Sequence, residues 1–505
     1  MTTSEQGAGP SGTIGGASNG GGAGGPSAAA PALPAIAHPK GGGAVRGIGE
    51  KFDVAAATGG GVATVPLAST PGRGGFGPDL TLSYDSGRGN GPFGLGWDLA
   101  LPAVRRKTDK GLPRYRDGED ADTFVLSDAE DLVPVLDGAG ERVVTPRRVH
   151  EVDFDVHPYV PRVEGRFARI ERWVRTDDGT AHWRALGGDG TTTLYGADPE
   201  SRIADPADPR RIFAWLISRT FDERGNLMVF GYAAEDGAGV DTTRPHEANR
   251  TAAARATQRY PKRIRYGNAT PYLPTWEAEG PPPADPAAFH FEVVFDHGEH
   301  DPDAPLPAPD RPWAVRPDPF STYRAGFEVR TYRRCERVLV FHHFPGEPEV
   351  GEDCLVRATE LRYSDEAAPA DPRNPSYTLL AQVVQRGFRR DGAGAYLSRA
   401  LPPLELEYTA PELSQAVRTL DARAPPTSRR GSTARASATS TWTATRCRAC
   451  SPTRATAGRT SPTSARWRAR RRSARCAPWA TAARRGPRAA PCSCSTSPPT
   501  GSSTR

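Results

Sequence analysis

The stretch GRGGFGPDLTLSYDSGRGNGPFGLGWDLALPAVRRKTDKGLPRY, residues 72–115, decides the fold class of this chain. Glycine or proline interrupts it every few residues, and Leu80, Leu82 and Tyr84 alternate with polar residues in between. Apolar residues at every second position are typical of a strand with one buried face. The same period returns further along, at Phe93, Leu95, Trp97, Leu99 and Leu101. The stretch therefore predicts strands joined by tight turns, with large side chains on one face.

Strands are also expected through the rest of the chain as far as Tyr408. Five segments are rich in β-branched and aromatic residues and predict strands: Phe291–Asp296, Glu336–Phe344, Leu355–Ser364, Tyr377–Phe388 and Leu404–Tyr408. Phe213–Glu235 predicts a hairpin whose turn, Asp222–Asn226, contains Gly225 for a positive φ. A short helix is expected around Arg250–Gln258. Three proline-rich segments are expected to be loops: Pro281–Pro286, Asp301–Trp313 and Glu366–Pro375. The predicted fold is mainly β, from about Ala44 to Tyr408, in large curved antiparallel sheets with few helices.

Two motifs in this sequence resemble those of a known family: NGPFGLGW at Asn90–Trp97 and RRKTDKGLPRY at Arg105–Tyr115. They resemble the opening signature of the SpvB family, which includes the N-terminal part of the B component of insecticidal toxin complexes. Further segments agree with that family in the same order: Pro39–Phe52, Asp122–Val135, Ala168–Trp173, Ser201–Ile217, His246–Arg250, Phe291–Asp301, Arg316–Cys335, Phe341–Pro345 and Leu401–Tyr408. The resemblance spans residues 39–410.

The resemblance implies a structural, non-catalytic protein. A toxin B component is expected to join a C component, of the Rhs type, in a hollow shell around a cytotoxic segment. It is also expected to dock on the channel-forming A component through a propeller. The hairpin Phe213–Glu235 is similar to one unit of the tyrosine–aspartate type found in such shells. The chain covers the first part of the shell, so the resemblance implies a truncated subunit.

Two other functions stay open. Some proteins of the SpvB type carry an ADP-ribosyltransferase domain after this region, so the chain is alternatively the N-terminal secretion or binding half of such a virulence protein. That domain needs an Arg, a Ser-Thr-Ser strand and a Glu-x-Glu pair, and no such Glu pair follows Tyr408. The third possibility is an independent module that binds cell surfaces.

Composition divides the chain into four parts. Residues 1–38 are mostly Gly, Ala, Ser and Pro and predict a disordered leader. The β-rich domain, 39–410, is followed by a junction, 411–424, and by an arginine-rich tail, 425–505. The family resemblance implies that this junction leads to a propeller or middle domain that is missing here. The tail contains 17 of the chain's 65 basic residues and no acidic residue. Residues 1–426 therefore hold 65 − 17 = 48 basic and 59 acidic side chains, a net charge of −11. This acidic body gives no reason to expect binding to nucleic acid.

Cysteine content and apolar runs predict where the protein is made and exported. Only Cys335 and Cys354 lie in the β-rich part, too few for a disulfide framework, which suits folding in a reducing compartment. Residues 1–37 contain no secretory signal pattern, and no apolar run is long enough to cross a bilayer. We therefore expect synthesis in the cytoplasm without a Sec signal, export within a toxin complex by another route, and no direct membrane insertion.

The tail Thr427–Arg505 uses only Gly, Ser, Thr, Ala, Arg, Trp, Cys and Pro. Every codon for these residues has G or C in the middle, as expected when a GC-rich gene is read out of frame. Sliding Ser440–Thr445 back by one base permits Val-Asp-Leu-Asp-Gly-Asp, and the second Asp is forced by the codons of Trp442 and Thr443. Such acidic loops coordinate calcium in propeller blades. We therefore predict a frameshift near Ala424–Pro426, which resequencing tests; a nucleic-acid arm or a membrane-active tail are the alternatives.

One cluster of metal-ligand residues occurs in the β-rich part, Asp296-His297-Gly298-Glu299-His300-Asp301. One interpretation is a zinc or manganese site completed by His342 and His343. A zincin, however, needs its two histidines four residues apart on a helix, and here they are three apart after a strand. The favoured interpretation is a solvated polar turn that Gly298 opens.

The remaining candidates also favour structural roles. The glycine runs Gly41–Gly43 and Gly59–Gly61 lack the Lys and Ser/Thr of a phosphate loop and predict linkers and turns. Carboxylates among arginines predict a surface charge network: Glu164, Glu171, Asp177 and Asp178 with Arg166, Arg169 and Arg172. The tail cysteines Cys447, Cys450, Cys492 and Cys494 lack the spacing of a zinc knuckle. No Gly-x-Ser-x-Gly motif occurs, and the Trp and Tyr residues predict core packing. The sequence thus predicts no catalytic residue, cofactor or metal.

Overall fold

Antiparallel strand pairing builds almost the whole of the computed structural model. It describes residues 47–55, 59–119, 121–127, 131–163, 168–275, 282–364, 377–391 and 395–409. Several predictions fall outside these residues: those on the leader 1–38, Gly41–Gly43, Glu164, Arg166, the loop Glu366–Pro375, the junction 411–424 and the tail 425–505 with its cysteines. The chain divides after Ala410, and the described residues all belong to the first unit.

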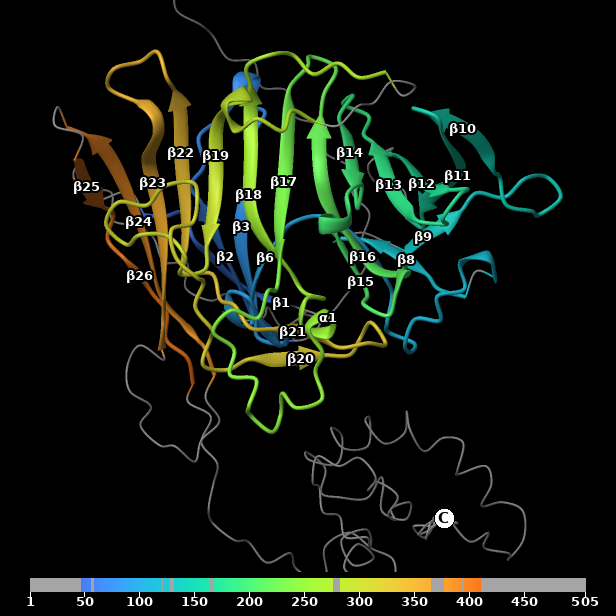
Figure 1. Ribbon diagram of the computed structural model, residues 1–505, viewed down its shortest axis with the longest axis horizontal. Coiled ribbons are helices and arrows are strands. Elements are labelled where there is room, and N and C mark those ends of the chain that lie inside the picture. Colours follow the sequence, from blue (N-terminus) through green and yellow to red (C-terminus); the bar gives the residue numbers. More distant parts are fainter. Residues whose placement is uncertain are drawn as a thin grey trace, which may run out of the picture. The chain divides into compact units, whose positions relative to one another are not determined.

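A large open sheet forms the centre of this unit (Figure 1). Seven strands pair antiparallel in chain order: β16 (Asp208–Phe221), β17 (Leu227–Ala234), β18 (Arg259–Asn268), β19 (Phe289–Asp296), β22 (Arg337–Phe344), β23 (Gly351–Tyr363) and β24 (Leu380–Arg390). β24 then pairs with both β25 (Tyr396–Ala400) and β26 (Leu404–Glu405). Residues alternate between the two faces along β18, where every second side chain from Tyr260 to Asn268 is buried. Each strand thus offers one face to a covered core.

The strands at the other end of the sheet close on themselves into a barrel. Eight strands pair in a ring: β7 (Ala103–Arg106), β8 (Phe124–Leu126), β9 (Asp131–Pro134), β11 (Val152–Pro161), β12 (Arg169–Arg175), β13 (Ala181–Leu186), β14 (Thr192–Tyr195) and β16. β10 (Thr145–Val149) pairs outside the ring with β11, and β15 (Arg202–Asp205) with β16. Trp183 and Trp215 fill the interior with Phe124 and Tyr159. Closure removes the free sheet edges that these strands would otherwise expose.

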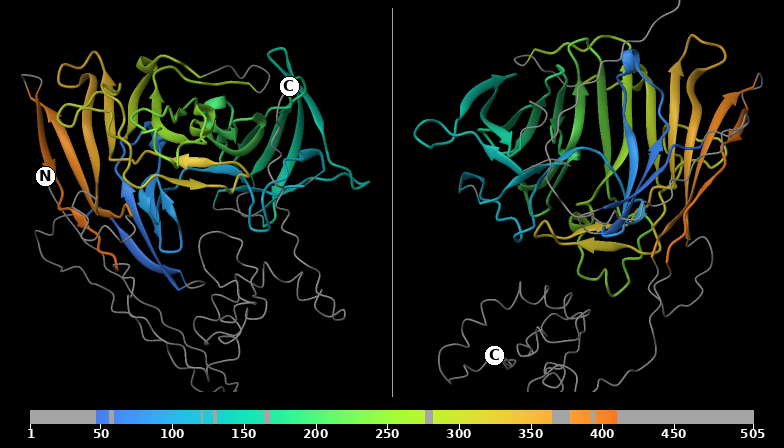
Figure 2. Two further views of the ribbon diagram at one scale, coloured as in Figure 1. Left: turned by 60° about the horizontal axis from the view of Figure 1, so that its bottom comes forward. Right: turned by 180° about the vertical axis from the view of Figure 1, so that it is seen from behind.

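A second, smaller sheet packs against the open sheet and completes the main core. Its strands are β1 (Lys51–Ala55), β2 (Gly60–Leu67), β3 (Leu80–Asp85) and β6 (Trp97–Leu99). Figure 2 shows this sheet, in blue, across the back of β18, β19 and β22. Leu80 and Leu82 pack there with Ile264, Val293 and Val340 of the large sheet. Two stacked sheets with interdigitated apolar side chains form a standard β core.

The glycine-rich signature Asn90–Trp97 folds as very short strands rather than one continuous strand. β4 (Asn90–Gly91) pairs with β5 (Gly94–Leu95), and β6 follows directly. Gly94 and Gly96 have φ of +96° and +84°, a conformation that L residues rarely adopt. These two glycines turn the chain so that Phe93 and Trp97 both enter the main core.

Short helices and one ribbon connect the strands. The α-helix α1 (Ala252–Arg255) is capped by Thr251, whose hydroxyl accepts from the backbone N–H of Ala254 at 3.1 Å. The 3₁₀ turns are η1 (Arg73–Gly75), η2 (Asp117–Glu119), η3 (Pro199–Ser201) and η4 (Pro286–Ala288). The ribbon β20 (Phe320–Thr322) and β21 (Val329–Thr331) runs across the strand ends near α1 (Figure 1). None of the helices in the described ranges has the length and apolar character required to cross a membrane.

The mainly β fold class is confirmed, as are the individual strands predicted for residues 291–388. The predicted strand Leu404–Tyr408 is real but short, since only Leu404 and Glu405 pair. The hairpin is confirmed as β16 and β17, with Gly225 at φ +82° in its turn. The turn prediction for Gly59–Gly61 is confirmed at Gly59, which has φ +70° just before β2. The closed barrel was not predicted.

Candidate functional site

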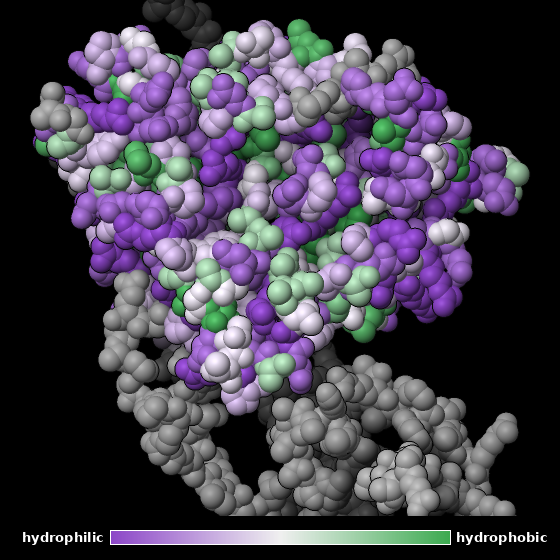
Figure 3. All heavy atoms as spheres, in the orientation of Figure 1, coloured by the Kyte–Doolittle hydropathy of each residue, from purple (hydrophilic) through white to green (hydrophobic). Residues whose placement is uncertain are grey.

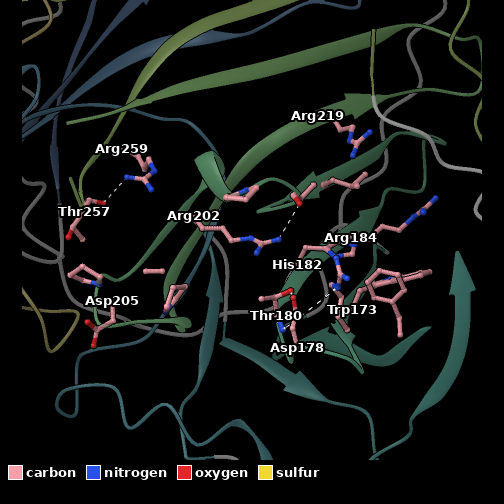
Figure 4. Close-up of a pocket in the computed structure, with 18 of the residues that line it drawn as sticks. Trp173, Asp178, Thr180, His182, Arg184, Arg202, Asp205, Arg219, Thr257 and Arg259 are labelled. Carbon is pink, nitrogen blue, oxygen red and sulfur yellow. Dashed lines mark hydrogen bonds and ion pairs between the residues drawn. The ribbon is translucent and has the colours of Figure 1, made fainter. Parts of the chain in front are cut away.

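A pocket of about 680 Å³ lies on the outer side of the barrel strands (Figure 4). Alternate residues of β12, β13 and β14 line it, while their neighbours Trp183 and Tyr195 face the barrel interior. The remaining lining residues come from β10, β11, β15, both ends of β16, α1 and the start of β18, and from the turns that connect them. Pockets for small molecules usually measure about 300–1,000 Å³, so this pocket has the size of a ligand site.

Five arginines line this pocket. Arg175 of β12 pairs with Asp177 and Asp178, and the other four come from four different strands (Figure 4): Arg184 of β13, Arg202 of β15, Arg219 of β16 and Arg259 of β18. The sheet geometry explains why they meet. Barrel closure and the attachment of β15 bring strands together that lie up to 75 residues apart in the sequence, counted from Arg184 to Arg259. Guanidinium groups gathered in one concave site create a positive potential that concentrates anions.

Two of these arginines are held by backbone carbonyls. Arg202 donates from Nε to the carbonyl oxygen of Gly196 at 2.6 Å and from Nη2 to that of Ala197 at 3.1 Å. Arg259 donates from Nη1 to the carbonyl oxygen of Ala256 at 2.6 Å. Within the described residues, neither Arg202 nor Arg259 pairs with a carboxylate, and burial lowers the pKa of both. Their charges are therefore fixed in position without a neutralising carboxylate.

The two carboxylates in the pocket lining are already paired. Asp178 lies 3.7 Å from Nε of Arg175, and Asp205 lies 2.7 Å from Nη1 of Arg211. Each of these acids therefore neutralises an arginine other than Arg202 or Arg259. The pocket keeps an excess of positive charge in an otherwise acidic body.

Aromatic side chains form one wall of the pocket. The rings of Trp173 and His182 stack with centroids 5.9 Å apart, and the ring of Phe154 lies edge-on 5.5 Å from that of Trp173. Burial, together with the charges of nearby Arg202 and Arg219, lowers the pKa of His182 to about 3. His182 is therefore neutral near pH 7 and belongs to the apolar side of the site.

The structure brings together three residues of the metal-ligand cluster that the sequence predicted at the end of β19. Asp296, Glu299 and His300 each place a ligand atom within 4.8 Å of the others. The Nζ of Lys262 pairs with the carboxylate of Glu299 and lies 3.1 Å from Nε2 of His300. Asp296 in turn pairs with Nε of Arg337 at 2.6 Å. Side-chain cations thus already meet both carboxylates, so these residues fit a buried ion-pair network better than a metal centre.

The favoured interpretation of this segment, a solvated polar turn, needs a correction. The turn is present, because β19 ends at Asp296 and Gly298 has φ +94°. Its side chains, however, are buried: Asp296, His297, Glu299 and His300 are each less than 5% exposed. The following loop covers them, and its Asp310 donates a backbone N–H to the carbonyl oxygen of Glu299 at 3.0 Å.

His342 and His343 do not join this cluster. His342 lies opposite Phe291 in the sheet, and its Nε2 is 2.8 Å from the Thr70 hydroxyl. His343 lies 3.4 Å from the carboxylate of Glu292. His342 therefore links the large sheet to the segment after β2, whereas His343 links β22 to β19 within the sheet, and neither contacts Asp296 in the contacts described. The cysteines Cys335 and Cys354 are both buried and free.

The predicted surface charge network is wrong for part of β12. Arg172 points into the barrel, where its Nη2 lies 2.5 Å from Oδ2 of Asp117, and Nη2 of Arg106 contacts the same oxygen at 2.9 Å. Glu171 is also buried, and it accepts from Nε of Arg169 at 2.6 Å. Barrel closure covers the inner face of β12, which carries Arg172, while Glu171 on the other face also accepts from Nε1 of Trp173 at 3.0 Å. Asp177 and Asp178 are exposed in a turn, as predicted, but their partner is Arg175, which was not among the predicted arginines.

Sequence reasoning did not identify the arginine pocket. Arg202, Arg219 and Arg259 lie on three separate strands, and nothing in their spacing relates them. One signal was present: Arg219 is the one charged residue of the segment Phe213–Phe221, and it is only 8% exposed. A charged side chain inside a buried strand requires hydrogen-bond partners or an opposite charge nearby.

Comparison with known proteins identifies the family. The SpvB family, described as Salmonella virulence plasmid 65kDa B protein, matches residues 55–344. The mono(ADP-ribosyl)transferase SpvB of Salmonella typhimurium strain 14028s is 36% identical over 338 residues, which make up 65% of this chain and 54% of that protein. The same enzyme of Salmonella dublin matches equally. The chain thus spans about half the length of the curated relatives that it matches.

Solved structures agree with this family. The N-terminal domain of effector protein SpvB from Salmonella typhimurium strain LT2 superposes with a TM-score of 0.55 at 33% identity, over 68% of this chain and 98% of that domain. The crystal structure of TcdB2-TccC3 gives 0.61 at 32% identity, over 75% of this chain and 17% of that one. The Photorhabdus luminescens Tc holotoxin pore gives 0.61 at 31% identity with the same coverage. Since the family match extends over more than half of the chain and the strands follow its solved members, this chain belongs to the SpvB family.

Proposed function

We propose that this protein is a structural, non-catalytic component of a bacterial toxin complex, where it forms part of the wall that encloses a cargo. One observation supports this choice above others. The likeness to TcdB2-TccC3 extends over 75% of this chain, against 68% for the SpvB N-terminal domain, and with the higher TM-score. The toxin-complex structures thus account for more of this chain than the virulence-protein domain does.

The physical character of the sheet suits a wall. β16, β23 and β24 have 14, 13 and 11 residues, and they lie side by side with other long strands in a curved array (Figure 1). The face seen there is largely hydrophilic, and its apolar residues form small separate patches (Figure 3). Buried ion pairs such as Arg333–Glu235 and Arg316–Asp318 fix the long loops over the strand ends. A rigid sheet with a charged surface keeps its shape without a catalytic centre.

The partners in this proposal are other toxin proteins. A C component of the Rhs type would complete the shell, and a channel-forming A component would receive it. Support comes from the matches to the TcdB2-TccC3 complex and to the Tc holotoxin pore. Export as part of such a complex follows from the same proposal.

A second candidate function rests on the curated relatives. They are mono(ADP-ribosyl)transferases, and the chain matches about half of their length. On this alternative, the chain is the N-terminal secretion or binding half of an ADP-ribosylating virulence protein. Neighbouring genes separate the two candidates, because a C-component gene favours the toxin complex and a transferase reading frame favours the virulence protein.

Co-purification tests the first candidate directly. The chain would be co-expressed with the C component encoded beside it, and the mixture separated by size-exclusion chromatography. We expect both to elute together in one complex. Gly89→Val, at a position with open space around its Cβ, should keep the complex, whereas Gly96→Val should lose it because its Cβ would lie 2.5 Å from the Tyr84 ring. Separate elution of two folded proteins would contradict the proposal.

A further inference from the structure

We propose that β1 is an interface between two copies of this chain, which pair antiparallel along this strand. β1 is the last strand of the small sheet: β2 pairs with it on one side, and the described residues place no strand on its other side. The proposal goes beyond the structural function proposed above, since a shell wall does not require this chain to associate with itself.

The free edge of β1 offers main-chain groups to another strand. The carbonyl oxygen of Ala55 accepts from the N–H of Gly59 at 2.7 Å, in the turn toward β2. Main-chain groups alternate in direction along a strand, so those of Phe52 and Val54 point away from β2. The N–H of Val54 accordingly donates to the exposed carboxylate of its neighbour Asp53 at 2.7 Å. An edge of this kind is a template for a further strand.

The side chains of Phe52 and Val54 continue the core-facing side of the small sheet. Phe52 lies opposite Ala63 of β2. The same row continues with Tyr84 of β3 and Trp97 of β6, so these four side chains share one face. Trp97 is buried in the main core, whereas Phe52 is 75% exposed and Val54 46%. The left view of Figure 2 shows the hairpin of β1 and β2, in dark blue, projecting beyond the strands of the large sheet. Apolar side chains exposed along a free edge favour pairing with another chain.

Charge complementarity indicates a second copy as the partner, and it selects one register. Two copies related by a two-fold axis pair about one residue of the strand. Pairing about Asp53 places two aspartates opposite each other, and pairing about Lys51 does the same with two lysines. Only pairing about Phe52 places Lys51 opposite Asp53 of the second copy, and it does so at two symmetric positions. Opposite charges across a strand pair are favourable, and like charges are unfavourable.

This register suits both faces of the joined strands. The two Phe52 side chains meet on the core-facing side, so the row that begins at Trp97 continues into the second copy. On the other face, Lys51 and Asp53 are both exposed, so each pair contributes little energy and serves mainly to fix the register. The same patch is used by both copies, and an interface of this kind closes after two chains.

Sedimentation equilibrium of the full 505-residue chain tests the proposal. A reductant is present throughout, because the arginine-rich tail contains further cysteines. We expect a monomer–dimer equilibrium in which the mass rises from 54.0 kDa toward twice that value, with a dissociation constant below about 100 µM. A mass that stays at 54.0 kDa up to about 100 µM would overturn the proposal, and so would a mass that rises beyond two chains.

A charge exchange tests the register. Lys51→Asp places two acids opposite each other at both symmetric positions, and the dissociation constant should rise about tenfold or more. The double variant Lys51→Asp with Asp53→Lys restores opposite charges in the same register, so its dissociation constant should return to within about threefold of the parent value. The matched control is Lys110→Asp, the same change at an exposed lysine in the loop after β7, which should leave the dissociation constant unchanged.

Blocking the edge gives an independent test. Val54→Pro removes an N–H that points away from β2, so the strand can still pair with β2 while the dissociation constant rises above about 100 µM. Thermal melting checks that each variant is folded, and if Val54→Pro is not, the charge exchange alone decides. A double variant that dissociates as readily as Lys51→Asp would overturn the proposal. An equal effect of Lys110→Asp would do so too, because association would then depend on net charge rather than on this register.

Discussion

The indole Nε1 of Trp97 donates a hydrogen bond to the hydroxyl of Tyr408 at 2.7 Å, although the two residues lie 311 positions apart. The same hydroxyl donates to the carbonyl oxygen of Leu380 at 2.8 Å. Trp97 belongs to the glycine-rich signature, and Tyr408 follows β26 at the other end of the described chain. One tyrosine therefore ties the small sheet to the last strands of the large sheet.

Replacing Tyr408 by Phe should destabilise this junction. The change keeps the ring, which packs 6.0 Å from that of Tyr84, and removes the acceptor of the buried indole N–H. An unsatisfied buried donor costs about 1–3 kcal/mol, so we expect the free energy of unfolding to fall by that amount in urea denaturation. The control is Tyr377→Phe, at an exposed tyrosine, which should stay within about 0.5 kcal/mol of the parent. Equal effects of the two variants would contradict the structure.

The pair Arg333–Glu235 gives a second prediction, because both side chains are completely buried. Nε of Arg333 lies 2.9 Å from Oε2 of Glu235, and its Nη1 donates to the carbonyl oxygen of Trp313 at 3.0 Å. Glu235→Gln leaves the buried arginine with only the exposed Asp236, 3.3 Å from its Nη2, as a counter-charge, so we expect a loss of up to about 3–5 kcal/mol in urea denaturation. Arg210→Gln removes a charge from an exposed pair and should cost less than about 1 kcal/mol. A loss for Glu235→Gln as small as that of the control would show that water reaches the pair.

Alanine substitutions in the glycine-rich signature test whether its turn requires glycine. Gly96 has φ +84°, and a Cβ there would lie 2.5 Å from the Tyr84 ring. Gly96→Ala should therefore lower stability by about 1–3 kcal/mol through backbone strain and displacement of the ring. Gly89→Ala, in the same segment with nothing within 4 Å of its Cβ, should change stability little. Thermal melting of both variants provides the comparison, and equal melting temperatures would mean that the turn does not require the positive φ of Gly96.

Much of the fold could be predicted from local patterns, for physical reasons that the residues show. Alternation at Leu80 and Leu82 predicted β3, and Gly225 predicted the turn of the hairpin, because period and positive φ are local properties. Barrel closure was not predictable in this way. Closure depends on the pairing of β16 with β7, which lies far earlier in the chain. Trp215, for example, pairs with Val104, and no local sequence pattern specifies such a distant partner.

The same distinction explains the errors at the candidate sites. The Asp296–Asp301 segment has the composition of an exposed turn, and only the later loop that contains Asp310 buries it. Arg172 has the sequence context of a surface charge, but the barrel gives β12 a second covered side. The arginine pocket combines side chains of β13, β15, β16 and β18, so it exists only after the strands are paired. Sites assembled from several strands are properties of the topology.

The buried histidine His297 predicts how stability depends on pH. It is 1% exposed between the rings of Tyr260 and Trp313, and burial, together with the charge of Lys262, lowers its pKa to about 3. In the unfolded chain a histidine has a pKa of about 6.5. Between these values the unfolded state therefore binds one more proton than the folded state, and acid favours unfolding.

We accordingly expect His297 alone to lower the free energy of unfolding by about 1.4 kcal/mol for each pH unit below about 6.5. Urea denaturation between about pH 7 and pH 5 measures this slope. His297→Phe keeps an aromatic ring and cannot be protonated, so its slope should be shallower by about one proton, whatever its stability at neutral pH. An identical slope in His297→Phe and the parent would mean that His297 is protonated or hydrated in the folded protein, and that the loop over it opens to solvent.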